Sequence, residues 1–159
     1  MSKSDDDAAS TAAAPPPMAA KPRKPRPRGD GFTDWMGVEY LHDEPGLRRI
    51  ALTLEPRHMS RAKRVHGGVL FTLLDTALGG AVVHALPRGK GAATLELKIN
   101  YFRPIQHGRV VAEGRLVNQT RSTAYAEGEV VNEEGKVLAK ASGTFFITDA
   151  VVQSERARL

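Results

Sequence analysis

The stretch of sequence that decides the fold runs from His66 to His84 and reads HGGVLFTLLDTALGGAVVH. It is long enough for a helix of about five turns, is apolar on almost every side, opens with two glycines and carries one carboxylate, Asp75. A helix that is apolar nearly all round is expected to be buried. The same length suits a membrane span. The carboxylate, the threonines and the glycine pairs favour instead the core helix of a soluble domain, with no membrane contact.

The segments around this helix alternate apolar and polar residues, as half-buried strands do. We expect a hairpin before the helix, over 40–44 and 47–54, and four strands after it, over 92–103, 110–119, 123–131 and 136–147. On one face of the last three strands the central residues are small: Gly114, Gly128 and Gly143, each preceded on that face by alanine. Interiors are close-packed, so the helix is expected to fill the trough that these residues leave. The predicted fold is therefore α+β, a curved antiparallel sheet wrapped around one long central helix.

Two finer expectations follow from residue spacing. Phe32 and Trp35 are three residues apart, which predicts a short helical turn that caps the core. In the strand over 92–103, four apolar residues alternate with polar ones and are expected to face inward. These four are Leu95, Leu97, Ile99 and Tyr101.

A chain of 159 residues fits one domain with short appendages. Residues 1–29 are Asp-rich, then Ala/Pro-rich, then basic, without hydrophobic periodicity, which predicts a disordered tail. We place the domain at 30–150 and a C-terminal tail at 151–159. No apolar leader marks a secretory signal, and the absence of cysteine fits a reducing compartment. A cytoplasmic location is expected.

The net charge of +5 is concentrated in the tail, since residues 1–28 contain six Lys or Arg and three Asp. The segment KPRKPRPR, Lys21 to Arg28, could contact nucleic acid or an acidic membrane surface. No aromatic residue interleaves these charges to stack on bases, so a solvated, proline-stiffened linker is the favoured interpretation. Nucleic acid is not expected as a partner.

Asp75 is the first candidate for chemistry. At 100° per residue it shares a helix face with Gly68, Phe71, Leu78 and Val82. A charge in the middle of an apolar helix is costly unless it is paired or hydrogen-bonded. Two interpretations stay open from the carboxylate alone. It is either a structural group bonded to a hydroxyl or amide, or a base or nucleophile in a partly dry cleft, where desolvation strengthens a carboxylate as a base.

The glycine pair favours the second interpretation. Gly67 and Gly68 lie where the helix begins, and first-turn N–H groups have no intrahelical partner. Without Cβ atoms a ligand oxygen can approach them, and the helix dipole favours a developing oxyanion there. An oxyanion site combined with a carboxylate indicates acyl-transfer chemistry.

The histidines add no metal site and no cofactor is expected. His66 precedes the helix and can cap it or bond the loop. His84 follows Asp75 by nine residues and lies on the opposite helix face, so a dyad between them is geometrically poor. The other histidines, His42, His58 and His107, show no ligand-like spacing.

Three motifs together resemble the hotdog-fold acyl-CoA thioesterases of the phenylacetic-acid-degradation type. They are HGGVLFTLLD, TLELKINYFRP (Thr94 to Pro104) and GKVLAKASGTFF (Gly135 to Phe146). The likeness covers roughly residues 31–148. It implies hydrolysis of an acyl-CoA thioester to a free acid and CoA, with CoA entering only as part of the substrate.

The resemblance also implies roles for individual residues. The Gly67 amide would polarise the thioester carbonyl, Asp75 would activate water or attack directly, and Thr94 would help to orient water. His66 would bond the supporting loop or the thioester region. The residues expected to bind substrate are the apolar strip of Phe71, Leu78 and Val82 next to Gly68, together with CoA contacts from Arg103, Arg121, Ser122 and Thr123.

Members of this family dimerise, often pair into tetramers, and complete each active site from the neighbouring chain. On that pattern Asp75 of one chain would meet Thr94 of another.

One departure from the family pattern concerns the Asn that commonly precedes HGG by a few residues. Here Ser60 is nearest and His58 is close by, and neither is a clean substitute. The alternatives are a hotdog hydratase or dehydratase, which needs a catalytic His beside an acid, and a non-catalytic acyl-CoA-binding module.

Overall fold

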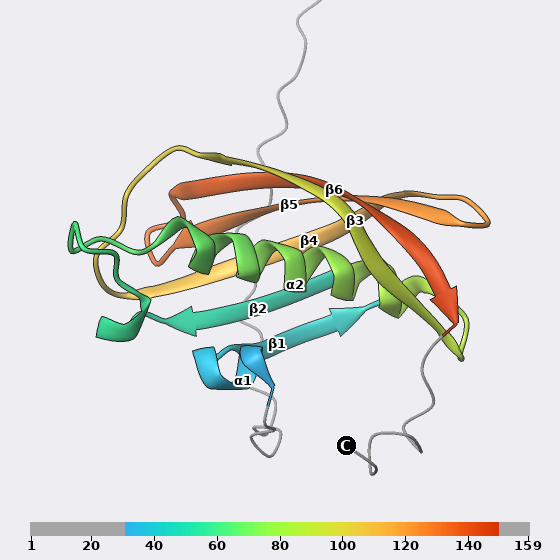
Figure 1. Cartoon of the computed structure of the whole chain (residues 1–159), viewed down its shortest axis with the longest axis horizontal. Coiled ribbons are helices and arrows are strands. Elements are labelled where there is room, and N and C mark those ends of the chain that lie inside the picture. The colour runs from blue at the N-terminus through green and yellow to red at the C-terminus, as the bar shows by residue number, and fades with distance from the viewer. Residues whose placement is uncertain (1–30, 150–159) are drawn as a thin grey trace, which may run out of the picture.

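The computed structural model describes residues 31–149, so the predicted tails at 1–29 and 151–159 lie outside the described residues. Six antiparallel strands form one sheet in the order β1-β2-β4-β5-β6-β3, and the long helix α2 lies against it (Figure 1). The elements are α1 (Phe32–Met36), β1 (Glu39–Glu44), β2 (Leu47–Thr53), η1 (Pro56–His58), α2 (Gly67–Ala85), β3 (Lys90–Tyr101), β4 (Arg109–Gln119), β5 (Thr123–Asn132) and β6 (Val137–Asp149). The predicted α+β fold is confirmed, with strand ends within about two residues of expectation.

The helix packs against the small residues at the centre of the sheet, as predicted. A Cβ on Gly114 would lie 2.5 Å from the backbone carbonyl of Ala77 in α2, and one on Gly128 would lie 2.5 Å from Leu78 Cδ1. Helix and sheet can approach this closely only because both positions lack a side chain. Among the described residues, α2 is the helix long and apolar enough to span a membrane. In this fold it contacts all six strands.

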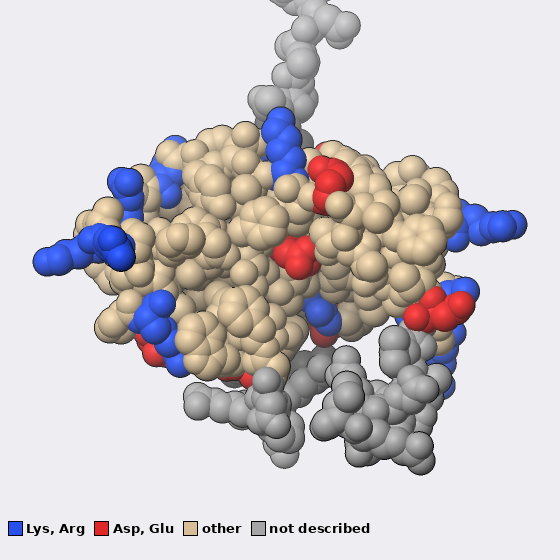
Figure 2. Space-filling model, viewed as in Figure 1, with Lys and Arg blue, Asp and Glu red and all other residues tan. Residues whose placement is uncertain are grey.

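One face of α2 stays open within a single chain, so the expectation of burial all round is wrong. The sheet curls around the other sides, and Leu73, Leu74 and Ala77 are fully buried. Phe71 and Val83 remain 37% and 39% exposed. Figure 2 shows the side of the molecule on which α2 lies in front of the sheet. It is mostly uncharged, with most Lys and Arg toward its margins.

Strand β3 departs from simple alternation. Thr94 pairs with Phe145 and Glu96 with Thr144, so Leu95 is an extra residue in a β-bulge. Leu95 is consequently 61% exposed rather than inward-facing, which corrects that prediction. Thr94 pairs with the buried Phe145 and, although exposed, directs its hydroxyl toward α2. Leu97 and Ile99 are partly buried as expected. Tyr101, the fourth residue of the predicted set, is 50% exposed.

The short helix α1 forms where Phe32 and Trp35 predicted it, but these two side chains do not cap the core. They stack on each other with ring centroids 5.9 Å apart and stay 62% and 59% exposed. Met36, the last residue of α1, is buried and packs in the core in their place.

Candidate active site

In the first turn of α2, the backbone N–H of Gly67 has no hydrogen-bond partner among the residues that the structure describes. His66 is the N-cap residue, and its Nδ1 accepts a hydrogen bond of 3.0 Å from the Gly68 N–H. The His66 carbonyl accepts from the Val69 N–H at 2.9 Å, and the Gly67 carbonyl accepts from the Tyr101 hydroxyl at 3.0 Å. The His66 carbonyl, the Gly67 carbonyl and the Gly68 N–H therefore all have partners. The Gly67 N–H has none among residues 31–149. A fixed, unpartnered N–H at a helix N-terminus suits a developing oxyanion.

Tyr101, at the end of β3, explains why residue 67 is a glycine. A Cβ on Gly67 would lie 3.2 Å from the Tyr101 ring, closer than ordinary van der Waals contact. Burial raises the pKa of the Tyr101 phenol above its ordinary value of 10.0, so the hydroxyl keeps the proton that it donates. Sequence reasoning missed this residue as part of the site. The available signal was a glycine pair, which indicates close approach of another group.

A cavity of about 320 Å³ opens beside Gly67. Its apolar and aromatic walls include Leu70, Tyr101 and Phe102. The side chains of Arg64 and Arg103 also line it, and Arg103 donates a 2.7 Å bond to the Val137 carbonyl. The cavity therefore offers apolar contact close to two positive charges, which suits an organic group attached to an anionic one.

Asp75 lies in the middle of α2 and is half-buried. The Thr94 hydroxyl donates a 2.8 Å hydrogen bond to Asp75 Oδ1. This bond forms within one chain, which corrects the expectation that Thr94 would reach Asp75 from a neighbour. The bulge at Leu95 is the physical reason, because it turns Thr94 toward the helix of its own chain.

Within one chain, Gly67 and Asp75 cannot act on the same carbonyl group. They are eight residues apart in a continuous helix, a separation of about 12 Å along its axis. An oxyanion donor and a base or nucleophile must each lie within about 3–3.5 Å of the reacting atoms. Phe71 lies midway between them and is exposed.

Other predicted substrate contacts are not among the residues that line the Gly67 cavity. Leu78 and Val82 are fully buried in the core, so they do not line an open strip with Phe71 as expected. The curl of the sheet over this part of α2 covers them. Arg121 and Ser122 lie in the β4–β5 turn and Thr123 begins β5, at the opposite end of the sheet from the α2 N-terminus (Figure 1).

His58 and His84 have structural partners. His58 is buried, accepts from the Glu55 N–H at Nδ1 and lies 3.0 Å from the Met36 carbonyl through Nε2, so it is not free to replace the missing Asn. His84 lies 2.8 Å from the Gly80 carbonyl and 3.5 Å from an Asp43 carboxylate oxygen. It has no contact with Asp75, as the helical spacing predicted. Ser60 is used locally, since its hydroxyl donates to the Arg64 carbonyl at 2.8 Å.

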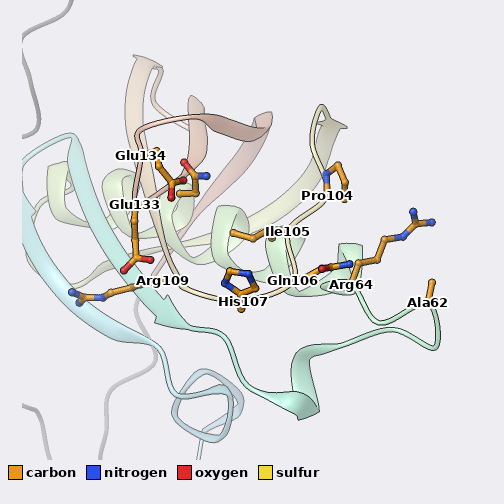
Figure 3. A pocket seen from close by; sticks show the side chains of 10 residues that line it. Ala62, Arg64, Pro104, Ile105, Gln106, His107, Arg109, Glu133 and Glu134 are labelled. Atoms are coloured by element: carbon orange, nitrogen blue, oxygen red, sulfur yellow. The ribbon is translucent and has the colours of Figure 1, made fainter.

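A second cavity, of about 420 Å³, shares the wall formed by Arg64, Pro104 and Ile105 (Figure 3). Its lining carries both signs of charge, with Glu133 and Glu134 opposing the arginines, so it selects neither anions nor cations. The Gly67 cavity is therefore the better candidate. Among residues 31–149, no three His, Asp or Glu side chains come together as a metal site would require.

Comparison with known proteins shows the family to which the chain belongs. The Thioesterase superfamily profile matches residues 62–139. A putative esterase of Deinococcus radiodurans is 34% identical over 124 residues, which cover 77% of this chain and 82% of the relative. The acyl-coenzyme A thioesterase PaaI of Escherichia coli is 26% identical over 115 residues, covering 72% and 80% of the two chains.

Among solved structures, a mutant of the phenylacetic acid degradation protein PaaI from Thermus thermophilus superposes with a TM-score of 0.67 at 35% identity. The match covers 72% of this chain and 96% of that one. The sequence motifs, the sheet wrapped around one helix and these relatives all indicate the same family. The chain therefore belongs to the thioesterase superfamily, as a hotdog-fold thioesterase of the PaaI-like type.

Proposed function

We propose that the protein hydrolyses acyl-CoA thioesters to a free acid and CoA, at a site built by two copies of the chain. One copy supplies the Gly67 N–H as oxyanion donor, and the other supplies Asp75 with its Thr94 hydrogen bond. The observation that carries this proposal is the free N–H of Gly67, held about 12 Å along the helix from the carboxylate of its own chain. The acyl-CoA substrate follows the names of relatives such as the Escherichia coli PaaI protein.

Two routes use the same groups. In the first, Asp75 removes a proton from water, the water oxygen attacks the carbonyl carbon, the C–S bond breaks and the CoA thiolate takes up the proton. In the second, an Asp75 oxygen attacks, CoA leaves, and water hydrolyses the resulting mixed anhydride. In both, the Gly67 N–H stabilises the charge on the carbonyl oxygen. Rapid quenching of the reaction with a radiolabelled acyl group separates the routes, since only the second attaches the label to the protein.

The exposed face of α2 supports a second copy as the partner. Phe71 and Val83 leave apolar surface open on the exposed face of α2. A two-fold axis that sets two α2 helices antiparallel would bring Gly67 of each chain toward Asp75 of the other. The β4–β5 turn with Arg121, Ser122 and Thr123 would then approach the partner's α2 N-terminus. Contact of this turn with CoA is part of the proposal.

Complementation between two strongly impaired variants tests the shared site. Gly67→Pro removes the N–H, and proline is well tolerated at the first helical position. His66 already has the extended backbone that a residue before proline requires. Asp75→Asn removes the base or nucleophile. A mixed dimer purified through two different tags contains one intact site of two and should recover about half of the wild-type rate.

A site formed within one chain predicts no recovery, because each chain of the mixed dimer carries one defect. Gly67→Ala is the matched control, since it adds a similar Cβ near Tyr101 but keeps the N–H. Pairing of dimers into tetramers, a cytoplasmic location and independence from any cofactor stay predictions. Size measurement in solution, cell fractionation and assay after exhaustive dialysis test them in turn.

A further inference from the structure

We propose that Tyr101 is a positioning residue for the reaction, whose hydroxyl holds the Gly67 peptide so that the Gly67 N–H stays aimed at the substrate carbonyl. This inference rests on the proposed role of Gly67. It adds a residue from β3 to a site whose other groups come from α2, its N-cap and Thr94 of the same strand.

The need for such a contact follows from the glycine itself. Glycine has the widest backbone freedom of any residue, and helix ends fray. An oxyanion donor is effective only when its direction is fixed before the reaction. The free N–H at Gly67 is therefore useful only if contacts from outside the helix restrict it.

Three hydrogen bonds supply that restriction. His66 contributes two, through its carbonyl to Val69 N–H and through its ring to Gly68 N–H. Tyr101 contributes the third, at 3.0 Å to the Gly67 carbonyl, and it is the one that comes from another element of the fold. Its ring also lies against the Cα of Gly67, where a Cβ would stand only 3.2 Å away. Tyr101 thus fixes the first turn of α2 relative to the sheet and to the cavity that both line.

Tyr101→Phe tests the hydroxyl alone, because it keeps the ring and the cavity wall. We expect kcat to fall about two- to tenfold, with KM changed less than about twofold, since the bond acts in the transition state. Tyr125→Phe is the matched control. The Tyr125 hydroxyl bonds Glu127 at 3.0 Å, and this change should leave both constants unaltered. A merely structural role would lower the melting temperature and leave kcat of the folded enzyme unchanged, which would overturn the proposal.

A double-variant cycle with Gly67→Pro shows whether Tyr101 acts through Gly67. Once the N–H is gone, adding Tyr101→Phe should cause no further loss of kcat. Losses that multiply instead would overturn the positioning role. Asp75→Asn, assayed in parallel, distinguishes failure of the proposed site from failure of the positioning role of Tyr101. If it leaves hydrolysis intact, the proposed two-chain site around Asp75 fails, whereas a silent Tyr101→Phe with a strongly impaired Asp75→Asn overturns only the role of Tyr101.

Discussion

The Thr94 hydroxyl donates a 2.8 Å hydrogen bond to Asp75 Oδ1, across the space between β3 and α2 of the same chain. The bulge at Leu95 makes this bond possible. Without the extra residue, Thr94 would share the outward orientation of Glu96 and point away from the helix. A local irregularity in a strand thus sets the surroundings of the carboxylate.

Replacing Asp75 by Asn should abolish hydrolysis while leaving the fold intact. The amide has nearly the same shape and can still accept the hydrogen bond from Thr94, but it is neither a base nor a nucleophile. A loss on the order of 10²–10⁴ in kcat is expected. Release of free thiol from a panel of acyl-CoAs, with circular dichroism as the folding control, measures this. Hydrolysis at the wild-type rate would refute a catalytic role for the carboxylate.

Replacing Thr94 by Val removes the hydroxyl with little change in volume. Hydrogen bonds to charged groups contribute about 1.5–3 kcal/mol, so kcat should fall roughly 10- to 100-fold. Thr94→Ser keeps the hydroxyl and should retain most activity. Activity that is retained in Thr94→Val but lost in Thr94→Ser would show that the methyl group, not the hydrogen bond, is what matters.

Replacing Gly114 by Ala should destabilise the fold. The new Cβ would lie 2.5 Å from the Ala77 carbonyl, so α2 would have to move away from β4. Overpacking of this kind costs about 1–3 kcal/mol. Urea unfolding followed by circular dichroism measures the change. Gly31→Ala, at the exposed N-cap of α1, serves as the control and should cost no more than about 1 kcal/mol.

Tyr101 should give stability a dependence on alkaline pH. Burial raises the pKa of its phenol above 10.0, so the folded protein keeps the proton at a pH where the unfolded chain loses it. This contribution to the free energy of unfolding is complete below pH 10.0, the ordinary pKa of the phenol. It is lost as the pH rises through the raised pKa of the folded protein. Thermal unfolding between pH 8 and 11 should show a steeper loss for wild type than for Tyr101→Phe. Parallel curves for the two proteins would contradict this.

Phe71 should lie near the two-fold axis of the proposed dimer, because it is midway between Gly67 and Asp75. The chain contains no cysteine, so Phe71→Cys introduces a single thiol. Packed helices lie about 8–10 Å apart, and a bifunctional thiol reagent of that length should link two chains in high yield. Trp35→Cys, on the exposed α1, is the control. Equal cross-linking at both positions would argue against this axis.

The sequence by itself determined the frame of this protein. Helical and strand periodicities, together with glycines at the centre of three strands, predicted one buried helix within a curved sheet, and packing density allows few other solutions. Asp75 and the glycine pair indicated the chemistry, because each is costly or unusual in a helix unless it has a partner or a use.

Only the tertiary structure decided which groups meet. The bulge that turns Thr94 inward depends on the pairing of β3 with β6, and no local pattern in β3 revealed it. Tyr101 reaches Gly67 from 34 residues away, through the course of the sheet. Leu78 and Val82 share a helix face with Asp75, yet the curl of the sheet buries them and leaves Phe71 open. The helical repeat gives the direction in which a side chain points from the helix axis. Whether that side chain is buried depends on what lies in that direction, and this is decided by contacts between segments that are distant in the sequence.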